Sequence, residues 1–101
     1  MQIIEDTIKK EGNICDLNFI DTSKITDMDF LFYNHTNFDG DISMWDVSNV
    51  KTMVSMFEYC SFDGDISKWD ISSVEDMNEM FYMCPLEQTY GSTPSVDKND
   101  I

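Results

Sequence analysis

An internal repeat constrains this chain more than any other feature of its sequence. The segments GDISMWDVSNVKTMVSMFEYCSFDG and GDISKWDISSVEDMNEMFYMC align without a gap at a period of 24 residues. An earlier copy, DLNFIDTSKITDMDFLFYNHTNFDG, aligns at an offset of 25 residues. Because short repeats bury their apolar side chains by stacking on one another, we expect three stacked units at residues 16–40, 41–64 and 65–88.

Seven apolar positions recur in all three units and predict the core. Stacking places equivalent side chains above one another, so that each recurring position forms a buried column. The columns are Leu17/Ile42/Ile66, Ile20/Trp45/Trp69, Ile25/Val50/Val74, Met28/Met53/Met77, Leu31/Met56/Met80, Phe32/Phe57/Phe81 and Phe38/Phe62/Leu86.

Each unit combines two apolar spacings. Residues 41–45 carry Ile42 and Trp45, a pattern that indicates a short strand. From Val50, apolar residues follow at i+3, i+6 and i+7, which is the spacing of one helix face. The sequence therefore predicts an α/β fold, a short leucine-rich-repeat-like solenoid of three strand–turn–helix units with an N-terminal capping helix.

Polar residues mark the expected boundaries of these elements. Ser48 and Ser72 precede the predicted helices as N-caps, and Ser72 makes a capping box with Glu75. The Asp-Gly dipeptides at 39–40 and 63–64 are typical of turns, so we expect them to return the chain to the next strand.

The ends of the chain differ from the repeats. Residues 1–15 predict an N-terminal cap, with a helix over 3–10 that places Ile4 and Ile8 against the first unit. Residues 89–101 are polar and rich in turn formers, and we expect a polar C-terminal tail there.

The pattern FDGDIS-WD(V/I)S-V--M--MF--C resembles the BspA-like leucine-rich-repeat family, a bacterial surface-protein repeat, over about residues 16–88. The resemblance implies a right-handed solenoid with protein-binding roles and without catalytic residues. It also implies an alternative function, namely an adhesion or scaffold repeat module of a bacterial surface protein.

One column of side chains could carry metal chemistry. His35, Cys60 and Cys84 share a position in the three units, and one His with two Cys could bind zinc. Cysteine in a tight column more often acts as a small buried hydrophobe. The Asp-Gly-Asp segments lack the spacing of a calcium-binding EF-hand. We therefore expect no metal, no cofactor and no catalytic residues, and hence no enzyme.

The charge balance excludes several partners. The chain has 20 acidic and 6 basic residues and a net charge of −14. Direct binding to nucleic acid or to an anionic membrane needs clustered basic residues, so neither is expected. Without an apolar run of about 18 residues or a secretory signal pattern, the chain is expected in the cytoplasm of a host cell, with reduced cysteines.

These observations favour a non-enzymatic protein-binding module whose acidic surface docks on a basic protein. Its sharpest form is a nucleic-acid-mimicking inhibitor, such as a phage or mobile-element anti-CRISPR or anti-defence protein. Turn formation and solubility are the competing explanation for the acids. A monomer or an edge-paired dimer is expected. The candidate partner-binding residues are Asp27, Asp29, Glu58, Glu75, Asp76, Glu79, Phe19 and Met44.

Overall fold

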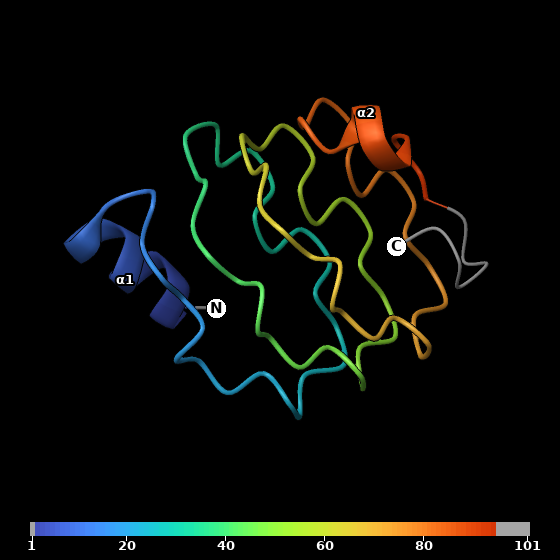
Figure 1. The fold of residues 1–101 in the computed structure, drawn as a ribbon, viewed down its shortest axis with the longest axis horizontal. Helices are drawn as coiled ribbons and strands as arrows, with labels where there is room; N and C mark the ends of the chain where they lie inside the picture. The colour runs from blue at the N-terminus through green and yellow to red at the C-terminus, as the bar shows by residue number, and fades with distance from the viewer. Residues whose placement is uncertain (1, 95–101) are drawn as a thin grey trace.

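Turns and extended segments form most of the molecule. The computed structural model describes residues 2–94, in which the helices are α1 (Gln2–Glu11) and α2 (Glu87–Tyr90). In Figure 1 the repeat segments run side by side between α1 at one edge and α2 at the other end. Pairing of strand type within these residues is limited to the isolated parallel bridges Asp16–Asp41, Asp27–Thr52 and Thr52–Asp76.

The predicted solenoid of three strand–turn–helix units is wrong. Between α1 and α2 the described chain has no helix, and its single-residue bridges form no sheet. The cause is a left-handed backbone at two equivalent positions of every unit. A right-handed helix cannot continue through such residues, because the left-handed conformation reverses the sense of the chain. These residues, with φ between 53° and 60°, are Phe30, Asn34, Ser55, Tyr59, Glu79 and Met83.

The apolar spacing of three belongs to successive tight turns instead. The Met56 amide donates to the Met53 carbonyl at 3.3 Å, and the Cys60 amide donates to the Phe57 carbonyl at 3.1 Å. Each such turn returns the chain after three residues, so side chains at i and i+3 point to the same interior. A helix and a chain of turns therefore share one sequence pattern here, and the pattern alone does not separate them.

Backbone hydrogen bonds join neighbouring units along residues 26–34, 51–59 and 75–83, which we call the ladder side. Alternate amides of one unit donate to carbonyl groups of the next at 2.8–3.0 Å. The donor–acceptor pairs are Met28–Thr52, Phe30–Val54, Phe32–Met56 and Asn34–Glu58, then Met53–Asp76, Ser55–Asn78, Phe57–Met80 and Tyr59–Tyr82.

The predicted core columns are buried, although the local structure differs from the prediction. Phe32, Phe57 and Phe81 are each 0% exposed, and their rings stack with centroids 5.5 and 5.8 Å apart. Ile25 and Leu31 of the first unit are only partly buried. Repetition of the apolar positions therefore predicts burial correctly, because burial requires only that equivalent side chains face one interior.

Both ends of the stack are covered by helices and their flanking residues. On α1, Ile4 is 1% exposed and Ile8 is partly buried, as expected for the predicted cap. The helix ends before Gly12, which has a φ of 93°. At the other end the Thr93 hydroxyl accepts the Glu79 amide at 2.8 Å. The rest of the predicted polar tail, 95–101, lies outside the described residues.

Candidate functional site

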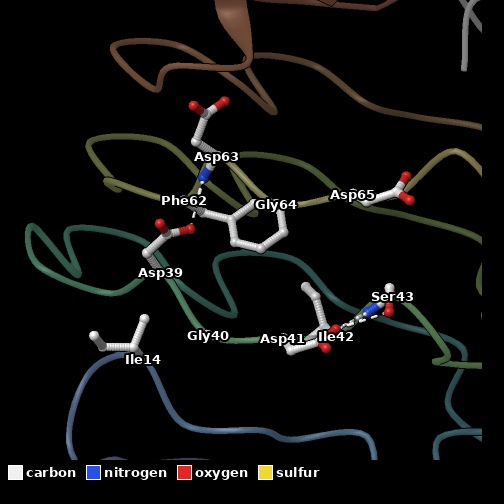
Figure 2. A pocket seen from close by; sticks show the side chains of 10 residues that line it. All are labelled: Ile14, Asp39, Gly40, Asp41, Ile42, Ser43, Phe62, Asp63, Gly64 and Asp65. Carbon is white, nitrogen blue, oxygen red and sulfur yellow. Dashed lines mark hydrogen bonds between the residues drawn. The ribbon is translucent and has the colours of Figure 1, made fainter.

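An acidic groove lies opposite the ladder side, between two Asp-Gly-Asp segments. We call residues 13–21, 38–46 and 62–70 the groove side. The groove has a volume of about 360 Å³ and is shown in Figure 2. Ile14, Ile42 and Phe62 supply its apolar lining. Four aspartates line it as well, namely Asp39, Asp41, Asp63 and Asp65.

The groove exists because the segments around Gly40 and Gly64 are not joined here by their backbones in the described structure. The Asp39 and Asp41 amides donate toward the N-terminal cap, to the carbonyl groups of Asn13 at 2.9 Å and Cys15 at 3.0 Å. Among the residues that the structure describes, no backbone hydrogen bond joins residues 39–43 to residues 63–67. Instead the Asp39 carboxylate accepts the Asp63 amide at 3.0 Å (Figure 2). A side chain therefore spans the separation.

The expectation that the Asp-Gly dipeptides form turns is wrong. Neither Gly40 nor Gly64 has a positive φ, and neither lies in a turn. A Cβ on Gly40 would lie 2.6 Å from the Phe38 ring and 2.6 Å from the Cys15 carbonyl oxygen. A Cβ on Gly64 would lie 2.5 Å from the Phe62 ring. Glycine is needed because a buried phenylalanine ring packs directly against the backbone.

Indole groups also link units on the groove side. The Trp45 Nε1–H donates to the Leu17 carbonyl at 2.9 Å, and the Trp69 Nε1–H donates to the Ile42 carbonyl at 3.1 Å. Both tryptophans are buried, so each hydrogen bond satisfies a backbone carbonyl away from water. The recurring Trp column thus supplies polar contacts as well as apolar area.

The predicted column of His35, Cys60 and Cys84 does not form one cluster, because its members contact different partners. The His35 Nε2 lies 3.0 Å from a Glu5 carboxylate oxygen, while the Cys84 thiol donates to the Phe62 carbonyl at 3.1 Å. Burial raises the thiol pKa values to about 12 for Cys60 and about 11 for Cys84. Such thiols stay protonated at neutral pH, a state unsuited to metal ligation. Among the described residues, no group of three ligands could hold a metal ion.

Exposed aspartates recur in register across the units, and each closes a turn. The Asp46 carboxylate accepts the Ser48 amide at 3.0 Å and also its hydroxyl, and Asp21 does the same with Ser23. The serine partners are therefore hydrogen-bond donors to an aspartate, and the predicted N-caps at Ser48 and Ser72 are wrong because no helix follows them. The hydrogen bonds from serine lower the pKa of Asp21, Asp46 and Asp70.

Three of the six predicted helix-face acids belong to the fold. The Asp27 carboxylate accepts the Asp29 amide at 2.8 Å, and the Asp76 carboxylate accepts the Asn78 amide at 3.0 Å. Asp29 links two units through the Val54 amide at 2.7 Å and the Thr52 hydroxyl at 2.6 Å. For these three candidate partner-binding residues, the competing explanation of turn formation and fold stability therefore has direct support in the structure.

The other predicted contact residues close no turn with their side chains in the described part of the chain. No hydrogen bond is recorded within residues 2–94 for the side chains of Glu58, Glu75 and Glu79, which lie on the ladder side. Phe19 and Met44 occupy equivalent turn positions and are 63% and 66% exposed, as the sequence pattern predicted. The structure therefore separates these residues into ladder-side glutamates and two apolar side chains on the groove side.

Sequence reasoning missed an exposed aromatic row on the ladder side. We define the tyrosine row as Tyr33, Tyr59 and Tyr82, extended by Phe30. Neighbouring rings meet edge to face, with centroids 5.7 Å apart for Phe30–Tyr33, 6.2 Å for Tyr33–Tyr59 and 5.6 Å for Tyr59–Tyr82. The dipeptides FY, EY and FY at 32–33, 58–59 and 81–82 were the available signal.

All four rings of the row are substantially exposed. The exposed fractions are 55% for Phe30, 43% for Tyr33, 41% for Tyr59 and 36% for Tyr82. The phenol of Tyr82, then partial desolvation and the Glu58 carboxylate, raise the pKa of Tyr59. The row is therefore an apolar surface beside a negative charge, and it crosses all three units.

The fold and these surfaces define a repeat protein that presents an acidic groove on one side and an exposed aromatic row on the other. A family model described as "Mycoplasma protein of unknown function, DUF285" matches residues 3–92, so the chain belongs to this family. Neither the curated proteins nor the solved structures contain a significant match. Within residues 2–94, neither helix has the length and apolar character needed to cross a membrane.

Proposed function

We propose that this protein is a non-enzymatic protein-binding module whose acidic surface docks on a basic protein surface. The observation that carries the proposal is the placement of Glu58, Glu75 and Glu79 on the ladder side, where their carboxylates close no turn of the described fold. The aspartate charges have a structural use, whereas these three charges have none that the fold requires. Charge without a structural use is available to a partner.

The electrostatic field of the whole chain supports this docking. The net charge is −14, and serine hydrogen bonds lower the pKa of aspartates such as Asp46 and Asp70, which favours their charged form further. A concentrated charge of one sign steers an oppositely charged partner and raises its association rate. The groove adds an apolar floor flanked by carboxylates, which suits the methylene stem and charged head of a lysine or arginine.

The sharpest form of the proposal is a nucleic-acid-mimicking inhibitor. Regular exposed aspartates, one set in each unit, would occupy the basic groove of a nuclease, a repressor or a CRISPR effector, as phage or mobile-element anti-CRISPR and anti-defence proteins do. Direct contact with nucleic acid is not part of the proposal, because phosphate groups repel this surface. Nucleic acid would then compete with the protein for the same partner.

An adhesion or scaffold module is the alternative, and the exposed tyrosine row is the observation that favours it. Nucleic-acid mimicry requires charge, whereas exposed aromatic surface of this extent is typical of protein contacts. The resemblance to the BspA-like leucine-rich-repeat family supports the same alternative.

Salt dependence and charge removal together test the proposal. The chain is immobilised, and proteins captured from a bacterial lysate are eluted with a salt gradient and identified. We expect the captured proteins to be basic, to elute as the screening length falls below about 8 Å near 0.15 M salt, and to be displaced by duplex DNA.

A charge-matched pair of variants completes the test. The variant Glu58→Gln/Glu75→Gln/Glu79→Gln should lose most of the binding. The control Asp6→Asn/Glu11→Gln/Glu87→Gln, which removes the same charge from the two helical ends, should retain it. Capture that ignores salt and is equal for the two variants contradicts the acidic-docking function and favours the adhesion or scaffold module.

A further inference from the structure

The tyrosine row is maintained at a cost to the backbone. Phe30 and Tyr59 have φ values of 59° and 55°, in the left-handed region that bulky side chains rarely adopt. Asn34, which occupies the position equivalent to Tyr59 in the first unit, is a residue type that tolerates this conformation. The equivalent positions also hold Ser55, Glu79 and Met83, so the fold does not require an aromatic residue there. Exposed aromatic rings at these positions therefore call for a use outside the fold.

Part of each ring in the row remains open to solvent. Each ring contacts its neighbour edge to face, an arrangement that leaves aromatic surface exposed to solvent. The chain contains six lysines and no arginine, and within residues 2–94 no cation lies on a ring of the row. The Glu58 backbone is fixed in the ladder by the Asn34 amide at 2.8 Å, which places its side chain beside Tyr59.

We propose that the tyrosine row with Glu58 binds an extended, arginine-bearing segment of the basic partner, so that guanidinium groups stack on the tyrosine rings and pair with the glutamate. This inference rests on the proposed acidic-docking function and names the chemistry that the partner presents. The row crosses all three units, so it can accept successive arginines rather than one.

Charge complementarity favours this occupant over others. A planar guanidinium stacks on an aromatic face and pairs with a carboxylate at the same time, whereas an ammonium group acts as a point charge. Nucleic acid bases could also stack on tyrosines, but a net charge of −14 repels their phosphates. A second copy of this chain would bring like charges together.

Two synthetic peptides of equal charge provide the test. A nonapeptide of alternating arginine and glycine and the matching lysine peptide are titrated by calorimetry, and the tyrosine ring resonances are followed by NMR. We expect the wild-type protein to bind the arginine peptide about tenfold more tightly, the effect of a few stacked guanidinium groups at exposed sites. The tyrosine resonances should shift with the arginine peptide.

The variant Tyr59→Asn separates binding from folding. It places the residue of the first unit at the same backbone conformation, so we expect a melting temperature within about 5 °C of the wild type. The preference for arginine should fall to about threefold or less, while affinity for the lysine peptide stays the same. Glu58→Gln should weaken both peptides.

Each remaining outcome contradicts one proposal or the other. If both peptides bind equally and Tyr59→Asn changes nothing, the tyrosine row is not the docking site, although acidic docking stands. If neither peptide binds at low salt, the acidic-docking function itself fails. A wild-type dimer in sedimentation that Tyr59→Asn converts to monomer would assign the row to a second copy and overturn the inference.

Discussion

The ladder side and the groove side hold the same three units together by different means. On the ladder side, ten amide–carbonyl bonds at 2.7–3.0 Å join successive backbones in the described residues. On the groove side, the segment around Gly64 is held by side chains, through the Asp39 carboxylate, the Trp69 indole and the Cys84 thiol. Backbone bonds do not depend on residue identity, whereas each of these three links requires one particular side chain.

This difference explains which sequence positions recur most strictly within the chain. The FDGDIS and WD strings, which recur almost unchanged in the second and third units, belong to the groove side. Outward positions of the ladder side vary from unit to unit, as at Asn34, Tyr59 and Met83. A surface that can vary without loss of the fold is suited to acquire a binding role, and there the exposed aromatic rings are found.

Phe57→Ala should have the largest effect, because this ring serves both sides at once. Phe57 is 0% exposed, and its ring centroid lies 4.7 Å from that of Phe62 on the groove side and 5.5 Å from that of Phe32 on the ladder side. The expected loss in the free energy of unfolding is about 3–5 kcal/mol. Urea denaturation followed by tryptophan fluorescence measures it. A loss below about 1 kcal/mol would contradict a single shared core.

Gly40→Ala should rank second and tests the groove side alone. The new Cβ would meet the Cys15 carbonyl oxygen and the buried Phe38 ring, both 2.6 Å away, and neither can withdraw easily. Overpacking of this kind costs about 1–3 kcal/mol. Glu75→Ala is the ladder-side control, since its amide still donates to Lys51 at 2.7 Å. Equal melting temperatures for the two variants would remove the distinction between the sides.

Trp69→Phe should have a smaller effect that isolates one polar link. The ring remains in the core, but the hydrogen bond to the Ile42 carbonyl at 3.1 Å is lost. The Ile42 carbonyl keeps the Trp45 amide at 3.2 Å, so the variant loses one of two hydrogen bonds to this acceptor. The net loss of one such bond costs about 0.5–1.5 kcal/mol. Thermal unfolding by circular dichroism measures the loss. Amide exchange should accelerate on the groove side more than along the ladder, and uniform acceleration would show that Trp69 does not act locally.

The sequence predicts which residues are buried far better than it predicts the elements that bury them. Recurrence at a period of 24 identified Met53, Met56 and Phe57 as core residues without specifying their backbone. The spacing of three fits either a helix or successive turns, and the deciding feature is a positive φ at Ser55 and Tyr59. Serine and tyrosine are not typical of a left-handed backbone. The sequence therefore gives no sign that the predicted helices are interrupted at these residues.

The candidate surfaces show the same limit. The sequence predicts the register of the aspartates, because the aspartates that close turns recur with the same period as the turns. The sequence does not predict which backbone amide a given carboxylate binds, because that amide can belong to another unit. Asp29, for example, accepts the Val54 amide. The repeat alignment does not predict the tyrosine row, because Tyr59 aligns with Asn34 and Met83 rather than with the other tyrosines. Its rings become neighbours only when the turns are placed in space.

Asp46→Asn should have the smallest effect, and its size depends on pH. Hydrogen bonds from the Ser48 hydroxyl and amide lower the pKa of Asp46, while the like charges of Asp21 and Asp70 oppose them. A carboxyl group with a lowered folded-state pKa stabilises the protein above its unfolded-state value, near 3.9, and this contribution disappears as the pH falls through the folded-state value.

The wild type should therefore melt above Asp46→Asn at pH 7, and the gap should close as the pH falls below about 4. Thermal unfolding of both proteins between pH 7 and pH 2.5 measures the gap. Glu75→Gln is the matched control from the ladder side, because its carboxylate closes no turn in residues 2–94, and its gap to the wild type should show no such closure. If the Asp46→Asn gap is constant with pH, charge repulsion from Asp21 and Asp70 cancels the effect of the serine hydrogen bonds on the pKa of Asp46, and turn chemistry alone does not account for these acids.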